Sequence, residues 1–588
     1  CTGAKSQTRA RRQCQTAPPP TRKLELATAL ESFNLFEPRR FGRGLMMKTA
    51  FALAFVLLAW PAAAAEAQPG PSIYEAPPPP APDNPIDQQV RERLSTLGIP
   101  PTLCSDAVFI RRVSLDLLGK LPTAAEARAF ITDPDTANKR RRLIDRWLQR
   151  EEFADYWAMK WGDLLRIKAE FPVNLWPNAA QAYHRWVRAA LARNQPYDQF
   201  ARELLTASGS NFRVGPVNFY RALPNRTPEG IAAGAALIFM GTRTDAWPES
   251  QLAGLAACFS QVGYKPTREW KEEIVFWDPL KDIPEATNGL AVLPPPPRSN
   301  APPRTAVFPD GTRAPLSAER DPREVFADWL TAPGNPWFAR NIANRVWAWL
   351  LGRGLIHEPD DLRPDNPPSN PALLAYLEKE LVASHYDLKH LFRIILNSQT
   401  YQSSSLPRGD VALAEANQGC YVLRRLEAEV LIDAINQITG TSDLYTSAIP
   451  EPFTYIPSDQ PAVALADGSI TSPFLALFGR SARATGMENE RINKMLPPQW
   501  LHLLNSSHIQ RKLEQGPGLR ALGAPPRQPR VIATNLYLAI LSRFPSPDEL
   551  KVLENYIRSA RLKSEPRREH LVDIAWALIN SPEFIYRH

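Results

Sequence analysis

The stretch "HEPDDLRPDNPPSNP", residues 357–371, holds residue types that could do chemistry. His357, Asp360, Asp361 and Asp365 could supply ligands for calcium, or paired carboxylates for acid–base catalysis. Both uses require these side chains to converge in space. The alternative is a rigid loop whose Asp and Asn side chains cap helices and bind backbone amides, and its prolines favour that interpretation. The D-x4-D spacing also differs from that of an EF-hand loop.

The segment just before this loop, "NRVWAWLLGRG", contributes Arg345 as a fifth candidate. Its glycines turn the chain back, so Arg345 could pair with Asp360 or Asp361. A structural role is the simpler interpretation of such a partly buried ion pair than a catalytic one. We therefore treat Arg345 and the four residues of the loop as the candidate catalytic residues, and none of them as an established one.

Other polar patterns give weaker signals. His385 and His390 are five residues apart, and His502 and His508 are six apart. Neither pair therefore has the i, i+4 spacing of two metal ligands on one helix face. We predict no metal site and no bound cofactor. "RRLEAE" (424–429) alternates in sign and indicates a solvated helix face or a face between lobes. No G-x-S-x-G, P-loop or H-E-x-x-H motif occurs, which removes the simplest enzyme hypotheses.

The sequence "MMKTAFALAFVLLAWPAAAAEAQPG" has the layout of a secretory signal peptide. A lysine precedes a short apolar run, and Ala65-Glu66-Ala67 forms the cleavage site. We predict that residues 1–46 are mis-called upstream sequence, that 47–67 is the signal peptide, and that the protein is exported to the periplasm, cell surface or medium. The run is too short for a comfortable membrane span, so we expect none in the mature chain.

Charge and cysteine content narrow the class of protein further. Residues 1–67 carry +6 of the net charge of +8, which leaves +2 for residues 68–588. This nearly neutral part has no general attraction for nucleic acid. Its three cysteines, Cys104, Cys258 and Cys420, are far apart in sequence. We favour three buried apolar side chains over one disulfide, which export would permit.

The remaining chain predicts a mainly α fold, with two helical lobes joined by a proline-rich segment and little β structure. After a proline-rich tether (68–85), a first lobe covers 86–280, a proline-rich linker 281–320, and a second lobe 321–588. Within the first lobe, Phe109, Val113 and Leu117 form a helical stripe. Further helices are predicted at the following ranges: 178–194, 196–207, 227–241, 249–263, 497–514, 530–543, 546–560 and 566–580. Strands are predicted at 272–279 and 305–311, and residues 441–472 are expected to be irregular.

Long motifs in both lobes resemble a known family. "DAVFIRRVSLDLLGKLPTAAEARAF" and "FADYWAMKWGDLLR" resemble the cytochrome-c-like second domain of secreted planctomycete proteins. "DPREVFADWLTAPGNPWFARNIANRVWAWLLGRGLIHEPDDLRPDNPPSNPALLAYL" and "YDLKHLFRIILNSQTYQ" resemble the domain of unknown function that follows it. The resemblance implies location and architecture, and no established activity.

The loop in "FMGTRTDAWPESQLAGLAACFSQV" departs from this family. The resemblance implies a C-x-x-C-H haem-attachment box after the "FMG" turn, but residues 242–248 contain neither thiol nor imidazole. Covalent haem needs both. We therefore expect no haem here, and Cys258 to be a core residue.

Two functions remain as hypotheses. The first is an exported, non-catalytic binding or assembly module whose partner is an envelope protein or a glycan. The second is an extracellular hydrolase or lyase that acts on a polysaccharide-like polymer through the loop 357–365. The sequence does not decide whether the protein is an enzyme.

Overall fold

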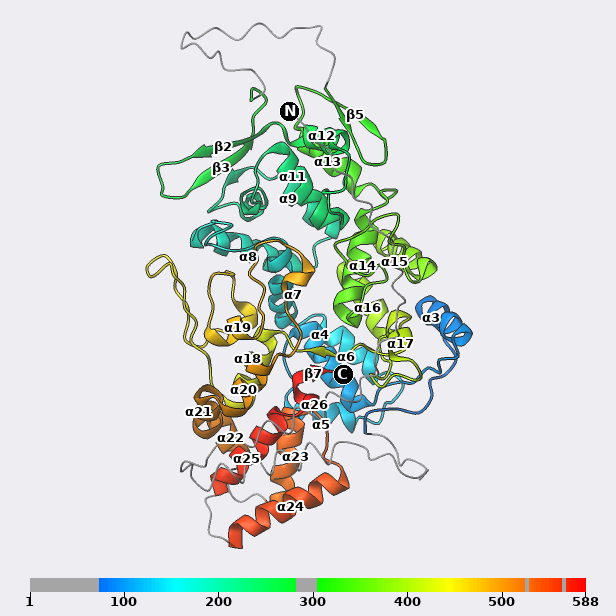
Figure 1. The fold of residues 1–588 in the computed structure, drawn as a ribbon, viewed down its shortest axis with the longest axis vertical. Coiled ribbons are helices and arrows are strands. Elements are labelled where there is room, and N and C mark those ends of the chain that lie inside the picture. The colour runs from blue at the N-terminus through cyan, green and yellow to red at the C-terminus, as the bar shows by residue number, and fades with distance from the viewer. Residues whose placement is uncertain (1–72, 282–303, 524–527, 563–566) are drawn as a thin grey trace, which may run out of the picture. The chain divides into compact units, whose positions relative to one another are not determined.

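The computed structural model describes residues 73–281, 304–523, 528–562 and 567–588. These residues lie within one compact unit, Ala64–His588 (Figure 1). The upstream segment 1–46 and the signal peptide 47–67 fall outside the described residues, and so do the first part of the tether and most of the proline-rich segment before residue 304.

Helices make up most of the part before the second proline-rich segment. They are α3 (Pro85–Thr96), α4 (Asp106–Leu118), α5 (Ala124–Ile131), α6 (Lys139–Trp147), α7 (Glu151–Leu164), α8 (Pro177–Ala192), α9 (Tyr197–Thr206), α10 (Asn218–Ala222), α11 (Pro228–Ala235) and α12 (Glu249–Ala256). The predicted stripe of Phe109, Val113 and Leu117 is fully buried on α4. Gly119 ends α4 with a φ of 61°, and Thr123 and Glu126 form a capping box at the start of α5.

The predicted helix 249–263 is too long. The structure ends α12 at Ala256, adds a short 3₁₀ turn (Ala257–Phe259), and then begins strand β2 (Val262–Pro266). β2 pairs antiparallel with β3 (Glu273–Trp277), and β3 pairs with β1 (Gly209–Ser210). The sequence "VGYKP" has a β-branched residue, a glycine and a proline that favour leaving the helix. A second hairpin joins β4 (Arg304–Val307) to β5 (Arg313–Leu316), so both predicted strand regions contain strands.

Helices also dominate the part after residue 320. They are α13 (Pro322–Thr331), α14 (Phe338–Leu351), α15 (Pro371–Ala383), α16 (Leu388–Asn397), α17 (Val411–Ala416), α18 (Ala428–Thr439), α19 (Pro473–Leu477), α20 (Pro497–Asn505), α21 (Ser507–Gln515), α22 (Pro517–Gly523), α23 (Pro529–Ile540), α24 (Pro547–Leu562), α25 (Arg567–Ile579) and α26 (Pro582–Ile585). The prediction of a mainly helical fold with little β structure is confirmed. The predicted helix 497–514 is two helices, because Ser506 caps a new one by accepting from the N–H of Ile509.

The two predicted lobes share one hydrophobic core. Trp157 on α7 lies against Trp349 on α14 and Phe392 on α16, with ring centroids 5.3 and 4.5 Å apart. The C-terminal strand β7 (Tyr586–Arg587) pairs with β6 (Arg424–Arg425), close to α4 (Figure 1). The lobe boundaries stay a prediction, but helices from both sides of the proline-rich segment pack into a single body.

Candidate functional site

The candidate residues of the acidic loop have different surroundings. Arg345 and Asp360 form the predicted pair, with Nη2 and Oδ1 2.9 Å apart and side chains 1% and 2% exposed. The other carboxylate oxygen of Asp360 accepts from the backbone N–H of Glu488 at 2.7 Å. Asp360 therefore binds groups of the protein interior.

Of the other three candidates, His357 and Asp365 are exposed and Asp361 is partly buried. Asp361 pairs with Arg363 at 2.9 Å, and Asp365, 73% exposed, lies 3.6 Å from the same guanidinium. His357 is half exposed, and burial together with nearby Arg353 lowers its pKa. Asn366 donates to the backbone carbonyls of His357 and Asp361, which is the turn-stabilising role expected of a rigid loop.

The loop after Met240 packs against this acidic loop. Gly241 has a φ of 62°, and its carbonyl accepts from the N–H of Leu362 at 2.9 Å. Thr242 is buried and donates its hydroxyl to the carbonyl of Leu362 at 3.1 Å. The segment thus has a structural partner within the chain.

This segment does not fit a covalently attached haem. The fit would need two thiols and an imidazole, and the nearest thiol in sequence, Cys258, is fully buried in the core. Burial raises the pKa of Cys258 to about 12, which opposes the thiolate chemistry of attachment. Cys104 and Cys420 are also buried and unpaired.

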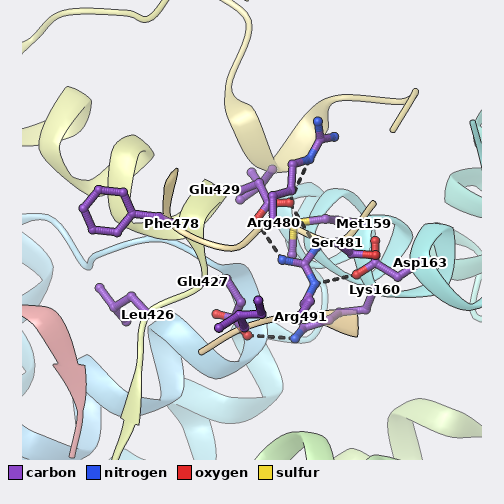
Figure 2. Close-up of polar contacts among 12 residues, drawn as sticks. Met159, Lys160, Asp163, Leu426, Glu427, Glu429, Phe478, Arg480, Ser481 and Arg491 are labelled. Carbon is purple, nitrogen blue, oxygen red and sulfur yellow. Dashed lines mark hydrogen bonds and ion pairs between the residues drawn. The ribbon is translucent and has the colours of Figure 1, made fainter. Parts of the chain in front are cut away.

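Of the two alternatives predicted for "RRLEAE", the solvated helix face is wrong, and the segment instead faces the other lobe. Arg425, Glu427 and Glu429 are 1%, 3% and 0% exposed, and the helix begins only at Ala428. Glu427 accepts from Lys160 at 2.7 Å and also from Arg587. Glu429 binds Arg491 at 2.8 and 3.0 Å (Figure 2). The alternation of sign in sequence reflects ion pairs with distant segments, which no local pattern reveals.

Further carboxylates extend these contacts into a buried ion cluster. Asp163 on α7 accepts from Arg483 at 3.0 Å and also from Arg491. Asp116 on α4 accepts from Arg587 at 3.0 Å. The buried ion cluster comprises Asp116, Lys160, Asp163, Glu427, Glu429, Arg480, Arg483, Arg491 and Arg587.

Electrostatics keep the two glutamates of the cluster charged. Burial alone would raise the pKa of Glu427, but Arg587 and Lys160 hold it well below its ordinary value. For Glu429, Arg491 and Arg480 outweigh burial and lower the pKa to about 2. Carboxylates that stay ionised across the neutral range suit a structural lock better than proton transfer.

The structure also places two histidines in contact whose spacing in the sequence did not predict a contact. Because the chain turns at Ser506, the Nε2 of His502 lies 3.4 Å from the Nδ1 of His508. The other ring nitrogen of His508 lies 2.8 Å from Asp443, which also binds Lys512 at 2.9 Å. A continuous helix would have hidden this arrangement, so the missed signal was the Ser-Ser cap in "LLNSSHIQ".

The geometry of this pair is that of a hydrogen bond. The ring centroids are 5.7 Å apart and the ring planes are inclined by 59°, and the tautomer of each ring decides which nitrogen donates. Within the described residues, no group of three or more His, Cys, Asp or Glu side chains is placed to hold a metal ion. Nearby, burial raises the pKa of Asp433 to about 7, although the N–H groups of Val463 and Ala462 lower it in part.

Fold and site together define a mainly helical protein whose two parts are joined by buried ion pairs. The family model described as PSCyt2, a protein of unknown function (DUF1549), matches residues 85–236, and that described as PSD1, a protein of unknown function (DUF1553), matches residues 322–557. The chain therefore has the planctomycete-type arrangement in which these two domains follow one another, as its motifs predict. Comparison with curated proteins and with solved structures gave no match.

Two further findings bear on the role of the chain. Across the part of the chain that the structure describes, every helix is too short or too polar to cross a membrane. The buried ion cluster crosses from one matched domain to the other, because Lys160 and Asp163 lie in the first match and Glu427, Glu429 and Arg491 in the second.

Proposed function

We propose that this chain is an exported, non-catalytic binding or assembly module of the cell envelope or periplasm, in a family whose haem-attachment box it lacks. The observation that carries the proposal is the buried ion cluster, which fastens the two domains into one body. It uses its charged groups in fixed pairs rather than leaving them free for substrate. A rigid two-domain body suits a surface that holds a partner.

The alternative, a polymer hydrolase or lyase, depends on the acidic loop. Asp360 is already engaged with Arg345 and the backbone of Glu488, which supports a structural role for it. His357 and Asp365 are exposed and Asp361 is partly exposed, so replacing all three distinguishes a hydrolase from a non-catalytic module.

Two measurements test the proposal: capture of a binding partner and an assay for polysaccharide cleavage. The tagged chain is used to capture partners from envelope extract and is assayed on a panel of polysaccharides. We expect a defined partner, no polymer cleavage, and the same result for the variant His357→Ala/Asp361→Asn/Asp365→Asn. Cleavage by the wild type that this variant loses would establish the hydrolase instead. Lys160→Met, which opens the ion cluster, should weaken capture.

Export has its own test. Residues 46–85 are fused to a reporter enzyme that folds only outside the cytoplasm. We expect reporter activity, and we expect it to disappear when the apolar run is interrupted by charged residues, because the run is what the export machinery recognises. A reporter that stays inactive with the intact segment would contradict export.

A further inference from the structure

The turn between β2 and β3 carries a positive charge that its own residues do not neutralise. Its sequence, "KPTREWK" (265–271), holds Lys265, Arg268 and Lys271 against Glu269. All four residues are exposed. Three cations and one anion give the turn a net charge of +2. Within the described part of the chain, none of the three cations has a carboxylate within ion-pair distance.

The carboxylates next to the turn are already paired. Glu273 lies 2.9 Å from Arg221 and 3.2 Å from Arg226. Glu272 is 8% exposed and lies 3.7 Å from Arg213. Each of these glutamates has at least one arginine of its own, so neither offsets the charge of the turn. Its three cations can therefore meet an anion from outside the chain.

Trp270 stands among these cations at the surface. It is 70% exposed, and no other tryptophan of the described residues is exposed. Its neighbour Lys271 has its Nζ 5.3 Å from the centre of the indole ring. Tryptophan is normally a largely buried residue. An exposed indole beside cations is typical of a membrane–water interface, where the apolar ring and the polar N–H contact different layers.

The hairpin that carries the turn is fixed to the body of the protein (Figure 1). Tyr264 on β2 donates its hydroxyl to the carbonyl of Tyr220 on α10 at 3.4 Å. The indole N–H of Trp277 on β3 donates to the side chain of Gln261 at 2.8 Å, and β3 also pairs with β1. A turn on such a support presents its ring and its cations in one arrangement.

We propose that this turn attaches the protein reversibly to the surface of an anionic lipid bilayer, with Trp270 at the level of the headgroups and the three cations against lipid anions. The charge of the turn selects an anionic partner, and the exposed indole selects one with an apolar layer behind its charged surface. An acidic polymer would instead need cations spread along a groove that follows its chain. The attachment requires no macromolecular partner, so it stands or fails independently of the proposed function.

Co-sedimentation with lipid vesicles tests the proposal. The chain from residue 68 onward is used, because it holds every described residue and lacks the apolar run 50–60, which could insert into lipid by itself. We expect binding to vesicles of equal parts phosphatidylcholine and phosphatidylglycerol, and none to phosphatidylcholine alone. High salt should release the protein, because it screens the charges.

Variants at exposed positions assign the binding to the turn. Arg268→Gln/Lys271→Gln should weaken it about tenfold or more, because each cation near an anionic bilayer contributes about 1 kcal/mol. Trp270→Ala should weaken it several-fold, because the variant lacks the interfacial ring. Lys379→Gln/Lys551→Gln removes the same charge from exposed positions on α15 and α24, and this control should bind as the wild type does.

A fluorescence measurement locates the ring in the bound state. Anionic vesicles with brominated acyl chains should quench part of the tryptophan fluorescence of the wild type, and Trp270→Phe should lose this quenching. Absence of binding to anionic vesicles, equal binding to neutral ones, an equal loss in the control pair, or quenching that Trp270→Phe retains would each overturn the proposal. So would binding to an acidic polysaccharide such as alginate in place of the vesicles, which would assign the turn to a glycan.

Discussion

Asp360 and Asp361 are neighbours in the sequence with opposite surroundings, and this contrast gives a test at the residue scale. Asp360→Asn leaves Arg345 buried without its anion, so we expect a loss of about 3–5 kcal/mol in the free energy of unfolding. Asp361→Asn removes one partly exposed pair with Arg363 and should cost less than about 1 kcal/mol. Urea denaturation of the two variants measures the difference. Equal losses would mean that the pair with Arg345 does not stabilise the fold.

The buried ion cluster allows a second comparison between matched ion pairs. The side chains of Lys160 and Glu427 are 8% and 4% exposed, whereas those of Arg320 and Glu324 are 48% and 47% exposed. Lys160→Met should destabilise the protein by about 2–4 kcal/mol, since Arg587 still faces Glu427. Glu324→Gln should cost less than about 0.5 kcal/mol.

Thermal unfolding of these two variants is the measurement. If Lys160→Met were as stable as the wild type, hydrophobic packing by the new side chain would outweigh the lost pair, and the cluster would not be the lock between the domains.

At the scale of elements, local signals in the sequence predicted most helices. The stripe on α4, the stop at Gly119 and the capping box of α5 depend on residues within one or two turns, which is why they could be read directly. The pairing of Arg345 with Asp360 was also predictable, because a short turn separates them. All of these involve neighbours in sequence.

The predictions that were wrong concern segments whose structure depends on residues far away in the sequence. Residues 257–266 leave the helix because β3 offers hydrogen-bond partners that the local sequence does not show. The segment 424–429 is buried because Lys160, Arg491 and Arg587 supply its counter-charges from far along the chain.

Gly119 gives a prediction for an element boundary. Its φ is 61°, and a Cβ there would lie 2.4 Å from Cδ2 of Tyr156, whose hydroxyl accepts from Arg587 in the ion cluster. Gly98 has a similar φ of 67° but open space around it. We expect Gly98→Ala to cost about 1 kcal/mol from backbone strain alone. Gly119→Ala should cost at least about 2 kcal/mol more, as overpacking of a core does.

Denaturation of both glycine variants decides this prediction. Similar losses would show that Tyr156 moves aside freely and that the end of α4 is not tied to the cluster.

At the scale of the whole molecule, buried arginines link non-helical segments to helices by donating to backbone carbonyls. Arg483 donates to the carbonyls of Ile167 and Ala466, and Arg166 donates to that of Thr485. These bonds satisfy backbone groups that would otherwise be buried without partners. The segment 441–496, whose only α-helix is the short α19, is thus built into the same body as α7, and loss of these bonds is expected to destabilise both.

Histidines with lowered pKa values make the stability of this body sensitive to acid. Burial lowers the pKa of His184 to about 3 and that of His588 to about 4, and it lowers the pKa of His502 as well. The unfolded chain binds protons to these groups near pH 6.5, so it binds more protons than the folded chain below that pH. Stability therefore falls as the pH drops from about 6.5 toward 3.

His184→Leu isolates the largest contribution to this acid sensitivity, because leucine has a similar size and cannot be protonated. From the two pKa values, His184 costs about 3 kcal/mol of stability between pH 7 and pH 4. The variant should lose that much less stability than the wild type over this range, as measured by urea denaturation at both pH values. His357→Leu, at a half-exposed position, is the control and should change the pH dependence by less than about 1 kcal/mol. If the wild type and His184→Leu lost equal stability between pH 7 and pH 4, the burial of His184 would not be a source of the acid sensitivity.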